Sequence, residues 1–353
     1  MDFALGEMEQ SVRDLAKEVA RNAIDDERSK QLMASQAWFD QPCWQALAET
    51  ELLGLGLSEA SGGADQSLLS VCLLMQQFGR RAPSIPLVES LSAALVLDAF
   101  GGDGERSHLK AFGQGDWMLN CALHEDETID LNHPLVRFDG RLFGSKTAVP
   151  EADGILLSAR DEAGPCLVLV EQMPAAAGRQ WSTDGQPRQR LHFEGQPARR
   201  IGGPEVLRFL VDRLYLLSSA YMLGLAEGAL FMTARYVSER QQFGVPLGSF
   251  QAVGQRAADG FIDCQAMELA LMEAAWRMET ERDHDQALAS ARYFACDGGH
   301  RVVASAQHLH GGMGFDRDYP LYRHFLQMKW YEFSLGGARS SLAKLGDLRV
   351  ENP

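Results

Sequence analysis

The stretch that decides the fold runs from Ser238 to Gln251 and reads Ser-Glu-Arg-Gln-Gln-Phe-Gly-Val-Pro-Leu-Gly-Ser-Phe-Gln. On both sides of it, apolar residues recur at the spacing that is typical of long amphipathic α-helices. Ser249 has a side chain suited to cap the N-terminus of the second helix. The stretch is therefore predicted to be a short corner between two long antiparallel helices. The residues that interrupt the helical pattern are Gly244, Pro246 and Gly248.

The same corner carries side chains that suit a flat, anionic ligand. The guanidinium group of Arg240 offers a fork of hydrogen-bond donors that matches the oxygens of a phosphate. Phe243 offers an apolar face against which a planar group can pack. The corner is therefore a candidate ligand site as well as a connection between helices.

Two segments of the chain resemble the acyl-CoA dehydrogenase family. The residues from Arg240 to Gln251 are similar to a family signature, Arg-Gln-Gln-Phe-Gly-x-Pro-Leu-x-x-Phe-Gln. The residues from His308 to Pro320, His-Leu-His-Gly-Gly-Met-Gly-Phe-Asp-Arg-Asp-Tyr-Pro, resemble the family's Gln-x-x-Gly-Gly-x-Gly-Phe/Tyr…Tyr-Pro segment. The alternative is an ordinary hairpin corner and a glycine helix stop in an unrelated helical bundle.

The resemblance implies a cofactor and the residues that hold it. In the family this corner binds the diphosphate and adenine side of FAD and reaches across a subunit interface. FAD is therefore the expected cofactor, and this chain is expected to provide a half-site for it. The residues expected to bind FAD are Arg240, Gln242, Phe243, Gln251, His308, Gly311 and Gly312.

Composition excludes several classes of protein. The chain has 353 residues, of which 46% are hydrophobic, which is enough for two or three packed units. A formal net charge of -15 means that the electrostatic field of the whole protein repels nucleic acid. A CoA thioester, which is also anionic, would have to bind at a local basic patch. The six cysteines show no Cys-x-x-Cys spacing, so they are expected to be buried thiols of a reducing compartment. They are Cys43, Cys72, Cys121, Cys166, Cys264 and Cys296.

The sequence gives no indication of a membrane or a secreted protein. No signal peptide is expected, because the residues from Met1 to Glu9 are acidic and lack the basic-then-apolar order. The most apolar run, from Leu214 to Phe231, is interrupted by Glu227 and is interpreted as a core helix. A cytoplasmic protein that binds neither membrane nor nucleic acid is predicted.

The order of patterns along the chain predicts an α+β fold with three domains. Residues 1–115 read as an N-terminal α-helical domain with a mixed polar segment from Asp25 to Gln36. Residues 116–203 contain short apolar runs and turn signals, such as Asp139-Gly140, and read as a barrel-like, antiparallel middle β domain. Residues 204–353 read as a C-terminal four-helix bundle. Its helices are predicted at Glu205–Arg240, Ser249–Arg282, Asp285–His310 and Tyr319–Gly346, with Gly311 ending the third.

The resemblance also locates a catalytic base, which this chain lacks. In the family reaction a carboxylate takes the α-proton of an acyl-CoA thioester while a hydride moves to the flavin. The family places its glutamate at one of two positions, which fall on Leu335 and on or next to Leu214. The flavin-facing Thr-Glu-Pro-x-Ala-Gly-Ser-Asp segment is also missing after the run Leu119–Glu125. No catalytic residue is therefore assigned to this chain.

An intact half-site without a base is similar to the non-catalytic subunit of heteromeric, α2β2 bacterial acyl-CoA dehydrogenases that act on steroid-CoA side chains. The tail from Tyr319 to Gly346 resembles that subgroup. The resemblance implies an acyl-CoA thioester substrate, a second acyl-CoA dehydrogenase-like subunit and an electron-transfer acceptor. The chain would then be active only together with its partner subunit.

Other roles remain open for a few residues. Glu332 lies one turn before Leu335 and could act as a displaced base in a self-sufficient homotetramer. A flavin-free scaffold that kept the fold is a further alternative. His308 and His310 lack additional ligands for a metal, so no metal site is predicted. Asp212 and Glu227 are expected on the exposed face of their helix.

Overall fold

The computed structural model describes residues 4–35, 39–128 and 130–351. The prediction that Met1 to Glu9 form no signal peptide therefore falls partly outside the described residues. The chain divides into two compact units. The sheet unit comprises Leu32–Val71 and Ser84–Leu217, and the bundle unit comprises Met1–Gln31, Cys72–Pro83 and Ser218–Pro353. The division at residues 115 and 203 into three domains stays a prediction.

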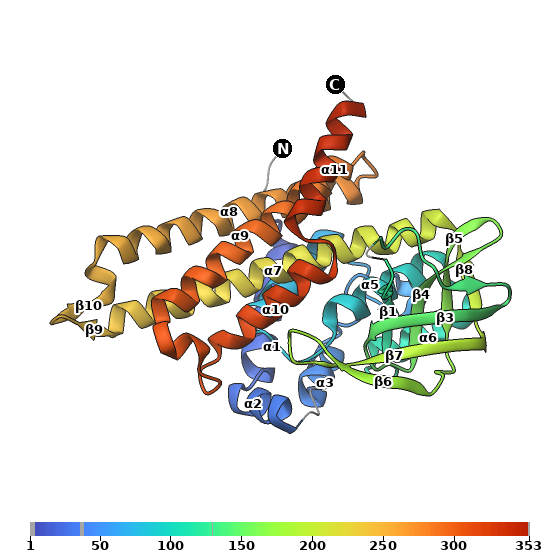
Figure 1. The fold of residues 1–353 in the computed structure, drawn as a ribbon, viewed down its shortest axis with the longest axis horizontal. Coiled ribbons are helices and arrows are strands. Elements are labelled where there is room, and N and C mark those ends of the chain that lie inside the picture. Colours follow the sequence, from blue (N-terminus) through green and yellow to red (C-terminus); the bar gives the residue numbers. More distant parts are fainter. Residues whose placement is uncertain (1–3, 36–38, 129, 352–353) are drawn as a thin grey trace. The chain divides into compact units, whose positions relative to one another are not determined.

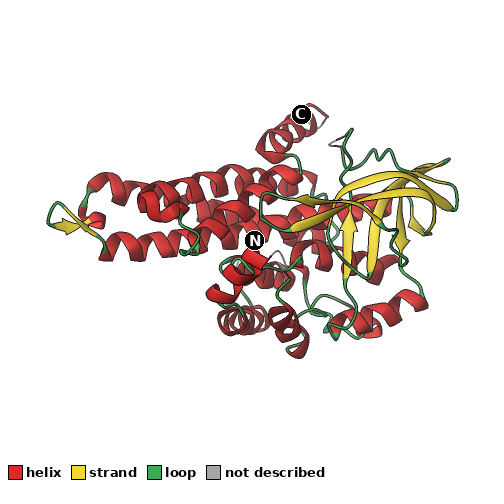
Figure 2. Ribbon diagram, turned by 60° about the horizontal axis from the view of Figure 1, so that its bottom comes forward, coloured by secondary structure: helices red, strands yellow, loops and turns green. Residues whose placement is uncertain are grey.

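The sheet unit is built on one eight-stranded sheet with the order β6-β7-β3-β2-β4-β5-β8, and β1 pairs with β4 (Figures 1 and 2). Its pairs are antiparallel as predicted, except that β1 and β2 run parallel to β4. The helices of this unit are α3 (Gln41–Glu49), η1 (Glu59–Ser61), α5 (Leu87–Phe100) and α6 (Asp103–Gly113). The strands are β1 (Leu119–Ala122), β2 (Arg137–Phe138), β3 (Arg141–Val149), β4 (Gly154–Asp161), β5 (Gly164–Val170), β6 (Ala176–Trp181), β7 (Pro187–Pro197) and β8 (Arg199–Gly202).

Alternating apolar residues form the core of the sheet. Ile155 and Leu157 of β4 and Val168 of β5 belong to one buried cluster on a single face of the sheet. The predicted turn at Asp139-Gly140 joins β2 to β3, and Gly140 adopts a φ of +93° that favours glycine. Strands β6 and β7 were not anticipated, because β6 is largely exposed and shows no apolar alternation.

A buried ion pair anchors the segment that follows β1. The ammonium group of Lys146 donates to the carboxylate of Glu125 at 2.6 Å and to the Ser158 hydroxyl at 2.8 Å. Burial lowers the pKa of Lys146 to about 8, although the charge of Glu125 acts in the opposite direction. The other oxygen of Glu125 accepts the backbone N–H of Leu135 at 2.7 Å. In this chain the segment after β1 is therefore tied to its own sheet.

In the bundle unit, α7, α8, α9 and α10 follow one another along the chain with short connections (Figure 1). Helices α2, α4 and α7 each contribute residues to both units. The helices are α1 (Glu7–Ala23), α2 (Asp26–Ser35), α4 (Leu68–Gly79), α7 (Pro204–Glu239), α8 (Gln251–Glu279), α9 (Asp285–His310), α10 (Leu321–Ser334) and α11 (Gly337–Glu351). The shorter elements are β9 (Gln241–Gln242), β10 (Val245–Pro246), η2 (Leu247–Ser249) and η3 (Gly311–Phe315).

Glycines let α4 and α7 cross closely. A Cβ atom on Gly224 would lie 2.1 Å from the carbonyl oxygen of Gln76, and one on Gly79 would lie 2.3 Å from that of Tyr221. Only hydrogen atoms fit at these two positions, so the backbones come nearer than helices with larger residues allow. Helix α7 is long and apolar enough to cross a membrane, but its most apolar window is mostly buried, as expected for a core helix.

The polar segment after α1, for which the sequence indicated no particular element, forms α2, which Asp25 caps by accepting the backbone N–H of Arg28 at 2.7 Å. Two local predictions about the helices are wrong. Ser249 does not cap α8, because its hydroxyl donates to the carbonyl of Pro246 at 2.7 Å and Phe250 is the N-cap residue. The predicted last helix is two helices, since Gly336 and Gly337 adopt φ values of +96° and +71° and end α10.

Candidate functional site

The corner between α7 and α8 is a tight hairpin at one end of the bundle unit (Figure 1). Val245 pairs with Gln242, and the backbone N–H of Leu247 donates to the carbonyl of Arg240 at 2.8 Å. The two turn residues, Phe243 and Gly244, have φ values of +55° and +83°. This conformation is ordinary for glycine but costs a phenylalanine about 1 kcal/mol or more. The hairpin is thus held in place by its backbone pairing, at the expense of strain in Phe243.

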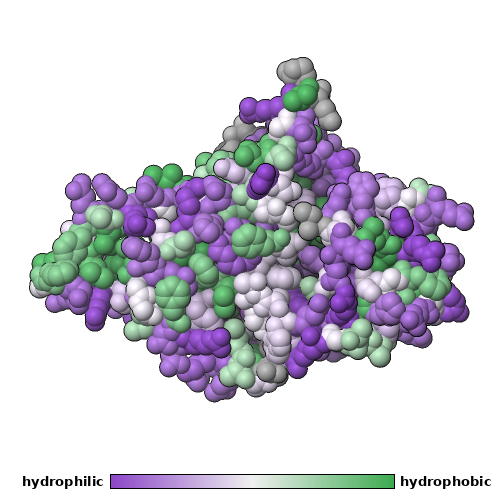
Figure 3. All heavy atoms as spheres, in the orientation of Figure 1, coloured by the Kyte–Doolittle hydropathy of each residue, from purple (hydrophilic) through white to green (hydrophobic). Residues whose placement is uncertain are grey.

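The residue in this strained conformation, Phe243, also has its aromatic ring in solvent. The side chain of Phe243 is 94% exposed, and its ring meets the ring of Phe250 edge to face at a centroid distance of 6.2 Å. Figure 3 shows a hydrophobic patch among hydrophilic residues at this end of the bundle. An apolar group exposed at strained backbone indicates a binding role, because neither feature stabilises the isolated chain.

Arg240 supplies the charge of the corner. Its side chain is exposed and makes no hydrogen bond or ion pair with any residue that the structure describes. Gln242 is exposed as well, and its side-chain amide donates to the carbonyl of Gln241 at 2.8 Å. A fork of donors beside an aromatic ring suits a phosphate that is attached to a planar group.

The fold gathers the predicted site residues at one end of the bundle unit. Because α8 and α9 are antiparallel, Gln251 at the start of α8 lies at the same end as His308 near the end of α9. Gly311 ends α9 with a φ of +58°, as predicted, and Gly312 follows in η3. Open space lies where a Cβ atom would project from Gly311 or Gly312, so a ligand can approach the backbone there.

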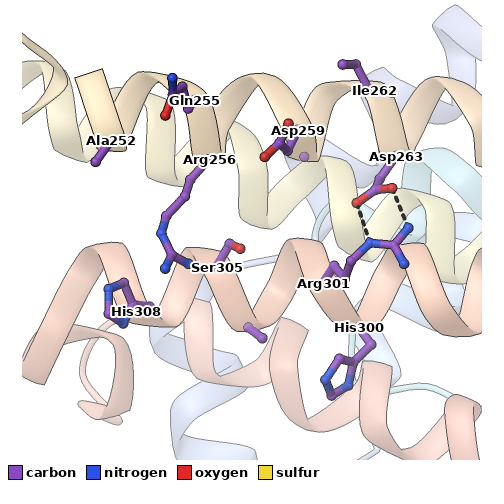
Figure 4. Close-up of a pocket in the computed structure, with 12 residues that line it drawn as sticks. Ala252, Gln255, Arg256, Asp259, Ile262, Asp263, His300, Arg301, Ser305 and His308 are labelled. Atoms are coloured by element: carbon purple, nitrogen blue, oxygen red, sulfur yellow. Dashed lines mark hydrogen bonds and ion pairs between the residues drawn. The ribbon is translucent and has the colours of Figure 1, made fainter. Parts of the chain in front are cut away.

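A groove of about 880 Å³ runs between α8 and α9 from this end (Figure 4). Arg301 of α9 crosses it and is neutralised by Asp263 of α8, with N–O distances of 2.6 and 3.0 Å, and by Asp297. These carboxylates raise the pKa of Arg301, so it stays charged. Arg256 reaches from α8 toward Ser305 in the same groove (Figure 4).

The two histidines of the His-x-His segment lie in different environments. His308 is exposed and lines the groove, whereas His310 is buried and stacks on Tyr236 at a centroid distance of 4.3 Å. The Nδ1 atom of His310 lies 2.8 Å from the carbonyl oxygen of Ala306, and burial lowers its pKa. His308 is therefore available to a ligand, and His310 supports the end of α9. Within the described residues no three His, Cys, Asp or Glu side chains are grouped as a metal site would require.

Leu335 and Leu214, which mark the two places where the family resemblance leads us to expect a catalytic glutamate, are both buried. Leu335 ends α10, and Leu214 lies within α7 in the sheet unit. The carboxylate of Glu332 is mostly buried and accepts a hydrogen bond from Lys329 at 2.7 Å. The ring of His300 lies 3.4 Å from the same oxygen. Glu332 is thus an ion-paired residue in this structure.

Two other carboxylates on α7 differ from expectation. Asp212 and Glu227 are buried, so the prediction that they lie on an exposed helix face is wrong. Asp212 lies 3.5 Å from the guanidinium of Arg208. Glu227 accepts hydrogen bonds from Gln76 at 3.0 Å and from Arg80 at 2.7 Å, so it ties α7 to α4. Their charges are tolerated inside the protein because they are paired.

The sequence analysis did not predict the charged residues that line the groove between α8 and α9. Arg256 and Asp263 lie seven residues apart on α8, and Arg301 and His308 lie seven apart on α9, so each pair shares a helix face. This spacing of charges could have indicated the groove, but the apolar residues of the same helices dominated the pattern. The six cysteines are all buried and free, as predicted.

Comparisons with known proteins identify the family of the chain. The model of the acyl-CoA dehydrogenase N-terminal domain matches residues 6–109, and that of the C-terminal domain matches residues 209–342. Acyl-CoA dehydrogenase FadE27 of Mycobacterium tuberculosis is 32% identical over 378 residues and covers 100% of both chains. The structure of the Tcur3481-Tcur3483 steroid ACAD variant is similar with a TM-score of 0.93, 36% identity and 99% of each chain covered. The ChsE4-ChsE5 complex from Mycobacterium tuberculosis is similar with a TM-score of 0.93, 33% identity and 100% of each chain covered.

Proposed function

The chain belongs to the acyl-CoA dehydrogenase family, and on this premise we propose that it is one subunit of a dehydrogenase made of two different chains. It provides a half-site for the cofactor, while its partner provides the carboxylate that removes a proton from the acyl-CoA thioester. One contrast carries the proposal. The guanidinium of Arg240 is open to solvent and unengaged by the described residues, whereas Leu335 and Leu214 occupy the positions of the base.

The cofactor is FAD, which accepts a hydride from the substrate when it is bound. The residues of the corner fit one side of this molecule. The exposed guanidinium of Arg240 suits the diphosphate, and the exposed ring of Phe243 suits a planar group. Gln242, Gln251 and His308 add donors, and Gly311 and Gly312 admit close approach of a ligand to the backbone. These seven residues form the proposed half-site.

The proposed substrate is a bulky, steroid-like acyl-CoA thioester. The support is that one of the similar structures is a steroid ACAD, with 36% identity over nearly the whole chain. The assembly with a second acyl-CoA dehydrogenase-like chain is supported by similarity to the ChsE4-ChsE5 complex at 33% identity. We further propose a cytoplasmic location and an electron-transfer acceptor that reoxidises the flavin.

Two alternatives are less well supported. A self-sufficient homotetramer would use Glu332 as its base, but this carboxylate is already paired with Lys329. A flavin-free scaffold would have no use for an exposed aromatic ring on strained backbone at Phe243. The heteromeric dehydrogenase accounts for both observations.

The test is to purify the chain alone and after co-expression with a second acyl-CoA dehydrogenase-like chain, and to measure flavin content and native mass. We expect a colourless chain alone and a yellow complex with equal amounts of the two chains. In the complex, Arg240→Gln should keep the mass and weaken FAD retention about tenfold or more, since a charge-assisted contact to phosphate is lost. Arg339→Gln, an exposed change on α11, should leave FAD retention unaltered.

A yellow homo-oligomer that turns over acyl-CoA by itself would overturn the proposal. If the Arg240→Gln complex binds FAD with unchanged affinity, Arg240 does not contribute to FAD binding and the proposed half-site is wrong. The scaffold would then be the better account of this chain.

A further inference from the structure

A second cavity of the bundle unit lies apart from the groove between α8 and α9. It has a volume of about 410 Å³ and shares no lining residue with that groove. Its wall is formed by α2, the turn after α4, the last two turns of α7 and the start of α10. None of the residues proposed for the half-site belongs to this wall, so the proposed function gives the cavity no role. A cavity of this size can hold a small organic molecule.

Two arginines of the wall are already neutralised. The guanidinium of Arg80 lies 2.7 Å from a carboxylate oxygen of Glu227. The guanidinium of Arg235 lies 3.1 Å from a carboxylate oxygen of Glu239. Each of these cations has its own anion, so the four side chains together add no net charge to the cavity.

The carboxylate of Asp26, which also lines the cavity, has to serve two further arginines. It contacts Nη2 of Arg323 and lies 3.8 Å from Nη2 of Arg81. Arg323 is only 3% exposed, and its Nε and Nη1 atoms make no hydrogen bond with a described residue. Because a buried cation needs a counter-charge, Asp26 is taken up by Arg323 and leaves Arg81 without a carboxylate of its own.

The guanidinium of Arg81 is therefore incompletely satisfied. Its one hydrogen bond within the described ranges runs from Nη2 to the carbonyl of Ile24 at 3.1 Å, and its buried Nε atom has no partner there. Buried donors and charges without partners cost free energy. The cavity thus carries one positive charge in excess, although the whole chain has a net charge of -15.

The lining also offers a hydroxyl donor and an apolar surface. The ring of Tyr236 lines the cavity and is fixed by stacking on His310, and its hydroxyl makes no hydrogen bond in the part of the chain that the structure describes. Met232 adds an apolar side chain to the same wall. A ligand with one acidic group and a compact apolar body matches this lining better than a bare ion does.

We propose that this cavity binds a small organic carboxylate. One missing negative charge corresponds to one carboxylate, which a guanidinium can hold through two parallel hydrogen bonds. Arg81 supplies the charge, Tyr236 donates from its hydroxyl, and Met232 contacts the apolar body of the ligand. The inference does not depend on the proposed dehydrogenase activity.

The test measures the binding of benzoate and acetate to the full-length chain by titration calorimetry. Benzoate should bind about tenfold or more tightly than acetate, because its ring buries apolar surface in the cavity. Arg81→Gln should weaken benzoate binding about tenfold or more, since a charge-assisted contact is lost. Tyr236→Phe keeps the ring and should weaken binding about threefold or more. Arg339→Gln, an exposed change on α11, is the matched control and should leave the affinity unaltered.

Tyr236→Phe decides the matter if Arg81→Gln disturbs the fold. A wild-type chain that binds no benzoate would overturn the proposal, and so would equal affinities in the wild type and Tyr236→Phe. Tighter binding of inorganic phosphate than of benzoate would overturn the ligand class. Benzoate affinity should be unchanged in Arg240→Gln, so this result is separate from the half-site, which is judged by FAD retention in the complex.

Discussion

The ammonium group of Lys329 donates a hydrogen bond to the carboxylate of Glu332 at 2.7 Å, and both side chains are mostly buried on α10. Lys329 also contacts the ring of His300, so the three groups form one network. A base must be free to take a proton from its substrate, whereas this carboxylate is already engaged by a cation.

Glu332→Gln is therefore expected to keep turnover of the heteromeric complex within about threefold of the wild type. The variant should lower the free energy of unfolding by about 1–3 kcal/mol, because Lys329 then loses a buried counter-charge. The turnover rate with an acyl-CoA tests the expected activity, and thermal unfolding tests the expected loss of stability. A loss of turnover by two orders of magnitude with an intact fold would identify Glu332 as the base.

Phe243→Asn separates the strain of the corner from its binding role. Asparagine tolerates the left-handed conformation better than phenylalanine, so stability should be unchanged or rise by up to about 1 kcal/mol. FAD retention by the complex should fall at the same time, since the exposed ring is gone. Phe333→Asn, which removes an exposed ring from α10, should not affect FAD retention. If both variants retain FAD equally, Phe243 has no part in the half-site.

Gly224→Ala probes the close crossing of α4 and α7. The new methyl group would overlap the carbonyl oxygen of Gln76, and backbone cannot move aside as a flexible side chain can. We expect a loss of stability of about 2–3 kcal/mol. Gly346→Ala on α11 is the matched control, because nothing lies near its Cβ position; it should stabilise by about 0.5–1 kcal/mol. Urea unfolding of both variants measures these differences, and equal stabilities would show that the helices can separate without cost.

His324 makes the stability depend on pH. Its ring is buried with Nε2 at 3.0 Å from the carbonyl oxygen of Arg80, and burial lowers its pKa to about 4. The unfolded chain, with a histidine pKa near 6.5, binds more protons than the native protein between about pH 6.5 and 4. The free energy of unfolding should therefore fall by up to about 3 kcal/mol as the pH drops through this range.

The variant His324→Gln keeps a hydrogen-bond donor but cannot titrate. Denaturant unfolding at several pH values should show a shallower fall for it than for the wild type below pH 6.5. His308→Gln, which changes an exposed histidine, should follow the wild-type curve. Parallel curves for wild type and His324→Gln would mean that another group controls acid unfolding.

The sequence by itself determined the fold class, the family and the place of the corner. Helical periodicity on both sides of Ser238–Gln251 was enough for the bundle, because a long amphipathic helix has few other ways to bury its apolar stripe. The absence of a carboxylate at Leu335 and Leu214 could also be read directly, since it concerns residue identity alone. Local periodicity did not find α2, whose residues are mostly polar, or the break at Gly336.

Only the tertiary structure decided which charged groups are satisfied. Arg256 and Arg301 look alike in the sequence, yet Arg301 is held by two carboxylates and Arg256 by none in the described chain. Glu227 and Glu332 likewise turned out to be partners of Arg80 and Lys329. The physical reason is that pairing depends on distances of a few ångströms between residues far apart in the chain, which helical spacing does not encode.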